Sequence, residues 1–540
     1  MIGTTDHATE GDPLKSGEEA TELKKKKTLK EVLGFHKLTH WRTAFFFLSL
    51  FLCLTIVFAF SFVLRCPVRP QYLVSWNRTF PKAASFDFLA VQAASDDKVR
   101  DVLFVLKTSE CAVNSTCGDA GLPSPCVFVL AVDGTDGVSL WERPLHPEFH
   151  WAQCGLEEDT GRTWDCLLSH SDQITAVDKH TGKIKWQQPQ LSGLHSTVPV
   201  LSIPDLDGDK VNDVALMGSD NTQTQLAFLS GKTGVQIGST VSLNSTEMHL
   251  LHRTAEGSHY VLLQTDTGLY GLALWRIAAK AKEGIEVRLK TDRHWEKDAS
   301  SATGLVPIYE SDSVNRVVRK EERSDPPNLL LVTSTDVVLV NGKDRKPMWR
   351  FNTSSVLSEP SFGHFNKDDV LDVVVEEEVG NYTKRIVILD GKTGVVLWQV
   401  SLLSCPNSPG PTAIHTTNGV SVFVFWGMMP PATNSSIPLM SDRRTYLMLP
   451  LYSEILLEST NSLDHIITFK ATLLEPGRHA AYFLLSGPEA EGDEDTVVLS
   501  KRKLKQDLQH SKVLRISSEG EWESNEDITD AFLRLRFSEE

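Results

Sequence analysis

The sequence predicts an all-β fold, a β-propeller of seven or eight blades, behind a single N-terminal transmembrane helix. Three observations predict it: an uncharged apolar run over residues 44–64, a glycine turn that recurs before a tryptophan, and an acidic loop that recurs before a β-branched run. The apolar run is long enough to cross a hydrocarbon core of about 30 Å as a helix. The other two motifs recur at the length of a propeller blade.

The apolar run is expected to remain attached to the mature chain. It follows 43 mostly polar residues and ends in Val63-Leu64-Arg65, whereas a cleavable signal peptide lies near the N-terminus and ends in small residues. We therefore expect a mostly disordered cytosolic tail over 1–43 and a signal-anchor helix over 44–64. The alternative is a buried core helix, but such helices normally have a polar face.

Two observations orient this helix with its N-terminus in the cytosol. Within twenty residues of the run, seven Lys or Arg precede it and four follow it, although a window of fifteen residues gives a tie. Every N-glycosylation sequon also follows the run, which supports a lumenal or extracellular C-terminal part. The sequons lie at Asn77, Asn114, Asn244, Asn352, Asn381 and Asn434. The sequence thus predicts a single-pass type II glycoprotein of the plasma membrane or a secretory-pathway membrane, held in the lipid bilayer through 44–64.

The glycine turn defines the blade repeat. A tryptophan stands four residues after the glycine at Trp141, Trp186 and Trp398, Gly238 takes that position in a fourth copy, and a looser turn ends at Trp349. The spacings are 45, 52, 111 and 49 residues, so the longest gap holds two units. We expect the glycine to supply a positive φ and the tryptophan to fill the gap between adjacent blades.

These repeats set the expected domain bounds. A juxtamembrane stalk is predicted over 65–84, the propeller ectodomain over 85–490 and a charged C-terminal segment over 491–540. Within the last segment, residues 528–537 are amphipathic and could pack on the propeller.

The acidic loop is most complete at 205–213, DLDGDKVND, with degenerate copies at 93–101 and 364–372. Ca²⁺ prefers several oxygen ligands, and this loop offers four carboxylates around a glycine turn. It predicts a structural Ca²⁺ site, although a solvated acidic turn is the alternative. The expected ligands are the side chains of Asp205, Asp207, Asp209 and Asp213 and the carbonyl oxygen of Val211.

The cysteines are typical of an oxidising compartment, because seven of the eight follow the apolar run. We expect two disulfides that close loops of about ten residues, Cys117–Cys126 and Cys154–Cys166. Cys66, Cys111 and Cys405 remain, which allows a free thiol, a long-range pair or an intermolecular bond at Cys66.

The acidic loop and its following strand resemble the FG-GAP repeat of integrin α-chain propellers. With the type II anchor added, the chain resembles the integrin-alpha FG-GAP repeat-containing transmembrane proteins from the membrane segment almost to the C-terminus. This resemblance implies a cell-surface glycoprotein and supplies no catalytic mechanism.

The expected function is a non-enzymatic module whose propeller binds a still unknown protein partner at the cell surface. A net charge of -16 repels phosphate backbones and argues against nucleic acid as a partner. A secretory-pathway assembly or trafficking factor is an alternative that differs in location. A quinoprotein-type enzyme is a third, because the TGxxLW turn resembles blades of quinone dehydrogenases, but the chain lacks their Cys-Cys pair. The oligomeric state is not predicted.

Overall fold

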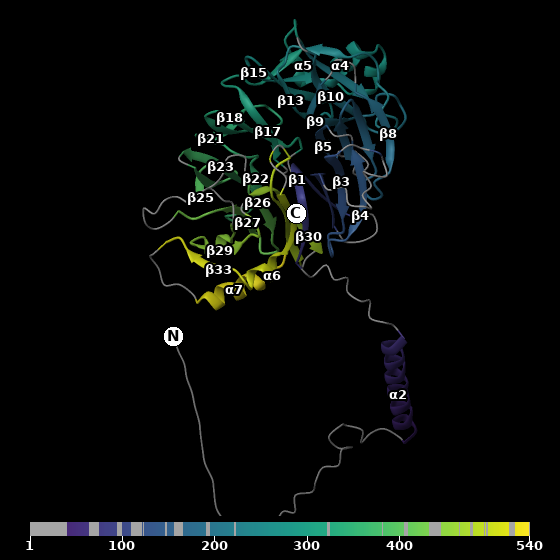
Figure 1. The fold of residues 1–540 in the computed structure, drawn as a ribbon, viewed down its shortest axis with the longest axis vertical. Coiled ribbons are helices and arrows are strands. Elements are labelled where there is room, and N and C mark those ends of the chain that lie inside the picture. The colour runs from purple at the N-terminus through teal and green to yellow at the C-terminus, as the bar shows by residue number, and fades with distance from the viewer. Residues whose placement is uncertain are drawn as a thin grey trace, which may run out of the picture. The chain divides into compact units, whose positions relative to one another are not determined.

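A computed structural model gives the fold of the chain (Figure 1). The residues that it describes are 40–63, 75–93, 100–109, 121, 124–145, 148–155, 166–190, 195–220, 223–320, 325–380, 382–403, 409–430, 444–463, 465–475, 479–490, 492, 495–517 and 524–538. The chain divides into two compact units, Met1–Arg69 and Pro70–Glu540.

The first unit contains the helix α2 (His40–Val63), which includes most of the predicted run. Its 24 residues extend for about 36 Å at 1.5 Å per residue. Apolar side chains on it are exposed, among them Phe45, Phe51 and Val57. By length and composition, this one helix among the described residues could cross a membrane.

The second unit is a set of antiparallel sheets, four of which have four strands each. The strands of these four sheets are β5 (Phe149–Gln153), β6 (Cys166–His170), β7 (Gln173–Val177) and β8 (Ile184–Pro189); β9 (His195–Ile203), β10 (Asp213–Asp220), β11 (Gln223–Leu229) and β12 (Val241–Leu243); β13 (Glu247–Arg253), β14 (His259–Thr265), β15 (Gly268–Ala273) and β16 (Leu305–Tyr309); and β17 (Val314–Lys320), β18 (Asn328–Thr333), β19 (Asp336–Val340) and β20 (Pro347–Asn352).

Two further sheets have five strands each. One contains β21 (Ser355–Val356), β22 (Ser361–Gly363), β23 (Asp372–Gly380), β24 (Thr383–Leu389) and β25 (Val396–Leu403). The other contains β26 (Thr412–His415), β27 (Ser421–Gly427), β28 (Arg444–Met448), β29 (Ile455–Thr460) and β33 (Lys512–Arg515). The short helix η3 (Pro450–Tyr452) lies between β28 and β29.

The first strands of successive sheets lie side by side around the middle of a ring (Figure 1). β9 contacts β5 and β13, β13 contacts β17, β26 contacts β22 and β30, and β30 contacts β1. Last strands such as β4, β8 and β25 lie on the outside (Figure 1). This arrangement is the predicted β-propeller, in which each sheet covers the faces of its neighbours.

The ring closes in a seven-stranded sheet that holds strands from both ends of the unit. Its order is β30 (Ile466–Glu475), β31 (His479–Ser486), β32 (Asp495–Lys503), β1 (Trp76–Ala93), β2 (Arg100–Thr108), β3 (Cys126–Val132) and β4 (Ser139–Leu145). The first part of β1 pairs with β32, with Trp76 opposite Lys501, and its second part pairs with β2. β1 therefore joins two four-stranded sets. The described strands form seven sheets. If the seven-stranded sheet is counted as two sets that share β1, the number is eight. The predicted blade number of seven or eight therefore depends on how this sheet is counted.

The strands extend beyond the predicted propeller bounds of 85–490. β1 begins at Trp76, inside the predicted stalk, and β32 lies inside the predicted C-terminal segment. The acidic loop and the glycine turn mark the middle of a blade, so they could not reveal strands that close the ring.

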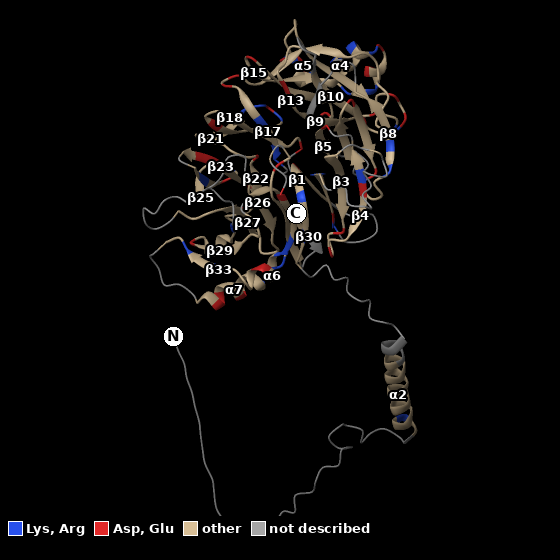
Figure 2. Cartoon of the chain, in the orientation of Figure 1, with Lys and Arg blue, Asp and Glu red and all other residues tan. Residues whose placement is uncertain are grey.

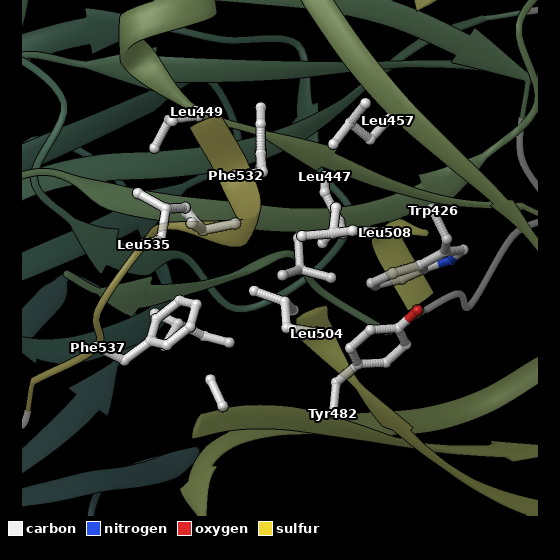
Figure 3. Packing of buried hydrophobic residues seen from close by; sticks show 14 of the residues in the cluster. Trp426, Leu447, Leu449, Leu457, Tyr482, Leu504, Leu508, Phe532, Leu535 and Phe537 are labelled. Atoms are coloured by element: carbon white, nitrogen blue, oxygen red, sulfur yellow. The ribbon is translucent and has the colours of Figure 1, made fainter. Parts of the chain in front are cut away.

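Two helices of the predicted C-terminal segment pack on this sheet and its neighbour (Figure 3). The helices α6 (Leu504–Leu508) and α7 (Asn525–Leu533) bury Leu504, Leu508, Ile528 and Phe532. Phe537 is also buried, in the same cluster as Trp426 and Tyr482. The expected packing of residues 528–537 is confirmed, and each buried Leu, Ile or Phe side chain contributes about 1.5–3 kcal/mol.

Tryptophans connect successive blades as expected. The ring of Trp349 lies against Gly394 in the turn of the next sheet, so that a Cβ there would lie 2.8 Å from Trp349 ring atoms. Gly394 has a φ of 74°, which favours glycine. The indole Nε1 of Trp349 donates to the carbonyl oxygen of Gly391 at 3.0 Å. Trp141 and Trp186 make the corresponding contacts with the turns of the sheets that follow them.

The long gap between turns holds two sheets, as predicted, and also a helical insertion that was not predicted. The insertion joins β15 to β16 and contains α4 (Leu274–Ala281), the 3₁₀ helix η2 (Ile285–Arg288) and α5 (Arg293–Lys297). Trp295 of α5 is buried, and the Arg345 guanidinium lies 4.7 Å from the centre of its ring. An aromatic ring from the insertion thus packs on the turn of the next sheet.

Replacing Trp349 tests these blade contacts. Trp349→Ala is expected to lower the free energy of unfolding by about 3–5 kcal/mol, because it leaves a cavity and removes the bond to Gly391. The measurement is denaturation of the purified full-length protein. Met348→Ala is the matched control, because the Met348 side chain is exposed. Equal losses in the two variants would contradict the packing role.

Ring closure also predicts a pH dependence at Lys501. Burial lowers the pKa of Lys501 to about 8, with the charge of Asp133 acting against the shift. The unfolded chain therefore binds more protons than the folded chain between about pH 8 and 10.5, so this residue makes stability rise with pH in that window. The melting temperature of wild type relative to Lys501→Met is expected to increase across it. Lys512→Met, at an exposed lysine, is the control. If the melting-temperature difference between wild type and Lys501→Met did not change with pH in this window, the lowered pKa of Lys501 would be refuted.

Candidate metal centre

The loop between β9 and β10 brings three of the predicted ligands together. Asp205, Asp207 and Asp209 each offer a carboxylate oxygen, and these oxygens lie within 4.8 Å of one another. Gly208 has a φ of 90°, which allows the sharp turn between them. Three separate carboxylates at this spacing suit a hard cation such as Ca²⁺.

Asp213 lies apart from these three and points into the sheet. Its Oδ2 accepts the N–H of Leu206 at 2.6 Å, and its Oδ1 accepts the N–H of Gly231 at 3.1 Å. Burial raises the pKa of Asp213 to about 6; the two backbone hydrogen bonds oppose the shift, and the charges of Asp207 and Asp205 add to it. Asp213 thus fastens the acidic loop to the glycine turn of its own sheet.

The same fastening occurs in the degenerate copy at 364–372. Asp372 accepts the N–H of Phe365 at 2.7 Å and that of Gly391 at 3.0 Å, and burial raises its pKa. In the sheet of β17–β20, the Oδ1 of Asn328 accepts the N–H of Gly342 at 3.2 Å. The last acidic position of the loop therefore has a structural role that needs no metal.

The backbone and an arginine already engage Asp205. Its oxygens accept the N–H groups of Gly208 and Lys210 at 2.5 and 2.9 Å. Arg288 of η2 places its Nη1 3.9 Å from Asp205 Oδ1 and donates to the carbonyl oxygen of Leu206 at 3.3 Å. Burial alone would raise the pKa of Asp205, but these hydrogen bonds and the Arg288 charge lower it.

Arg288 was missed by sequence reasoning. It lies in the helical insertion of the next sheet, which carries no repeat motif. A Cβ on Gly208 would lie 2.3 Å from its guanidinium, so the glycine also allows this close approach. A bound cation would compete with Arg288 for Asp205. The predicted carbonyl ligand, Val211, donates its N–H to Asp209 Oδ1 at 2.8 Å, and its role as a ligand stays a prediction.

Three of the predicted glycosylation sites lie on described residues, and all three asparagines are exposed. Asn77 lies near the start of β1, Asn244 directly follows β12, and Asn352 ends β20. Asn77 and Asn352 are on the outermost strand of a four-stranded set, and Asn244 directly follows such a strand. Asn114, Asn381 and Asn434 lie outside the described residues.

One of the two expected disulfides is confirmed. Cys154 and Cys166 are bonded, which ties the end of β5 to the start of β6. Cys126 is also disulfide-bonded, but Cys117 lies outside the described part of the chain, so that pairing stays a prediction. Cys66, Cys111 and Cys405 lie outside it as well.

A serine–histidine contact joins β22, β26 and β27. Ser421 Oγ lies 2.9 Å from His415 Nδ1 and accepts the backbone N–H of His364 at 2.9 Å. Burial lowers the pKa of His415 to about 4, and the nearby His364 adds to the shift. Because the Ser421 side chain is fully buried, this contact holds first strands together rather than presenting a nucleophile.

Comparison with known proteins identifies the family. The model of the FAM234A/B beta-propeller family matches residues 76–538. This chain belongs to the FAM234A/B family. The match begins at the first residue of β1 and includes β32 and α7, so the FAM234A/B propeller extends beyond the predicted bounds in the same way as the observed strands.

FAM234A and FAM234B proteins are similar to this chain over most of its length. Protein FAM234A of Bos taurus is 35% identical over 515 residues, which cover 93% of this chain and 92% of the relative. Protein FAM234B of Mus musculus is 27% identical over 500 residues, covering 88% and 79%. The solved structure of BamB from Moraxella catarrhalis aligns with a TM-score of 0.41 and 10% identity over 71% of this chain and 95% of that chain. A likeness of this degree carries no functional conclusion.

Proposed function

We propose that this chain is a non-enzymatic single-pass type II membrane glycoprotein whose propeller is a protein-interaction or adhesion-like module at the cell surface. One observation carries the proposal: every sequon follows the apolar helix, and the three on described residues are exposed and lie on or directly after outermost strands. Oligosaccharyltransferase needs accessible asparagines on the lumenal side.

The proposed topology rests on the same helix. α2 supplies one segment of membrane-spanning length, and the excess of basic residues before it favours a cytosolic N-terminus. The ectodomain then lies in the lumen or outside the cell, where the Cys154–Cys166 disulfide is stable.

The propeller suits partner binding because it is a preorganised surface. Tryptophan contacts and ring closure fix the blades to one another, so that little ordering is needed when a partner binds. Glycans on outermost strands would cover part of the outer rim. The two ends of the ring would then remain as contact surfaces.

A structural Ca²⁺ at 205–213 is part of this proposal. Asp205, Asp207 and Asp209 supply the carboxylates, and the loop is the one that resembles an FG-GAP repeat. The proposal includes a relationship to the third member of the integrin-alpha FG-GAP repeat-containing transmembrane series. The ion would stabilise the loop and have no catalytic part.

A secretory-pathway assembly or trafficking factor remains the second candidate, because the same topology serves an endomembrane protein. The exposed sequons support the cell-surface module and the endomembrane factor equally. The membrane in which the protein resides distinguishes the two candidates. A quinoprotein-type enzyme is the third candidate, and a quinone absorbance in the purified protein would support it.

Glycosylation at Asn352 tests both accessibility and topology. Ser354→Ala removes this sequon without altering the asparagine, so the variant is expected to carry one glycan fewer. The variant should migrate faster than wild type on a gel, and treatment of both with peptide-N-glycosidase should abolish the difference. Ser354→Thr keeps the sequon and is the matched control. Glycosidase added to intact cells should act on the surface protein. An unglycosylated wild-type protein would contradict the proposed topology.

Calcium titration tests the metal site. Ca²⁺ at a hundred times its Kd should stabilise the folded protein by about 2.7 kcal/mol, measured as a rise in melting temperature. Asp207→Asn combined with Asp209→Asn should abolish the rise, whereas Asp368→Asn, in the degenerate loop, should keep it. Arg288→Gln is expected to tighten Ca²⁺ binding, because it removes the competing cation. The same rise in the double variant would sink the assignment.

A further inference from the structure

Two neighbouring cavities lie among the first strands of the ring. One, of about 380 Å³, is lined by residues of β9, β13 and β17. The other, of about 580 Å³, is lined by residues of β1, β5 and β30. They share Gln153 and Gly155, so we treat them together as the cavity pair. Both volumes are in the range of ligand sites.

The cavity pair is strongly basic in a chain whose net charge is -16. Its charged and titratable lining residues are Arg253, Arg319 and His259 in the first cavity and Arg100, Lys179, Lys470 and Asp87 in the second. With His259 neutral, the described lining carries a formal charge of +4. Figure 2 shows basic residues among the strands around the middle of the ring.

Hydrogen bonds between first strands keep the walls of the cavity pair in place. The side-chain amide of Gln153 on β5 accepts the N–H of Val200 at 2.7 Å and donates to its carbonyl oxygen at 2.8 Å, which fixes β5 to β9. Arg319 on β17 donates to the carbonyl oxygen of Leu251 on β13 at 2.7 Å. The site is therefore preformed, and a ligand need not order it.

The distribution of charge indicates the class of ligand. The basic groups are spread over β2, β13, β14, β17 and β30 and over the turn after β7, on both sides of Gln153. A single small anion needs donors that converge on one point, whereas several linked carboxylates match positive charges at separate positions. Arginine also binds carboxylates through paired N–H groups.

We propose that the cavity pair binds an acidic peptide segment of a protein partner. The proposal deepens the protein-interaction function proposed above, on which it rests, by naming the chemistry of the bound segment. Arg253 and Arg319 contact carboxylates on one side of Gln153, and Lys470 contacts carboxylates on the other. The surrounding negative charge of the chain adds specificity, because it repels an acidic partner elsewhere.

The test is binding of a fluorescent hexaglutamate peptide to the purified full-length protein at fixed ionic strength. Saturable binding is expected, and Arg253→Gln with Arg319→Gln should weaken it about tenfold, since charge-assisted hydrogen bonds are lost. Lys470→Gln, on the other side, should weaken it as well. Arg534→Gln is the matched control, because Arg534 is an exposed arginine that directly follows α7 and does not line the cavity pair. It should bind as wild type does.

Three outcomes would overturn the proposal: no saturable binding, equal binding by wild type and the cavity variants, or binding of inorganic phosphate in place of the peptide. Melting temperatures of the variants show whether they fold, and Arg253→Lys provides a conservative change that keeps the charge. A negative result leaves the glycosidase experiment unaffected, so failure of this inference is distinguishable from failure of the membrane topology.

Discussion

The pairing of β1 with β32 is the constraint on which the rest of the structure depends. Each sheet of the ring buries its faces only if it has a neighbour on both sides, and the first and last sheets have them only when the ring closes. Strands from opposite ends of the second unit provide this closure, with Trp76 opposite Lys501. The cavity pair lies next to the closing sheet, and its walls include residues of β1 and β30. An open ring would have no such walls.

The middle of each blade could be predicted from the sequence, and the ends could not. Trp141, Trp186 and Trp398 follow turns whose glycines need a positive φ, and that local requirement leaves a pattern in one sequence. Trp76 makes the same kind of contact with Gly137, but no glycine turn precedes it, because its neighbour in the sheet comes from the other end of the chain. Strands that pair from opposite ends of the chain leave no regular repeat spacing in the sequence.

The acidic loop shows a similar limit at the level of single atoms. Its composition correctly indicated a cluster of carboxylates, and three of them do converge. Composition could not show that both oxygens of Asp213 are taken by backbone N–H groups, nor that Arg288 reaches Asp205 from the next sheet. A sequence does not distinguish an aspartate that accepts backbone hydrogen bonds from one that can bind a cation. Only the fold separates them.

The outermost strands also affect how neighbouring copies of the protein could associate in the plane of a membrane. Pro144 lies in β4, Pro189 ends β8 and Pro347 begins β20, and a proline cannot donate the hydrogen bond that an added strand would need. β12 is only three residues long, which gives an incoming strand little to pair with. At these four strands, such edges discourage neighbouring copies from joining their sheets.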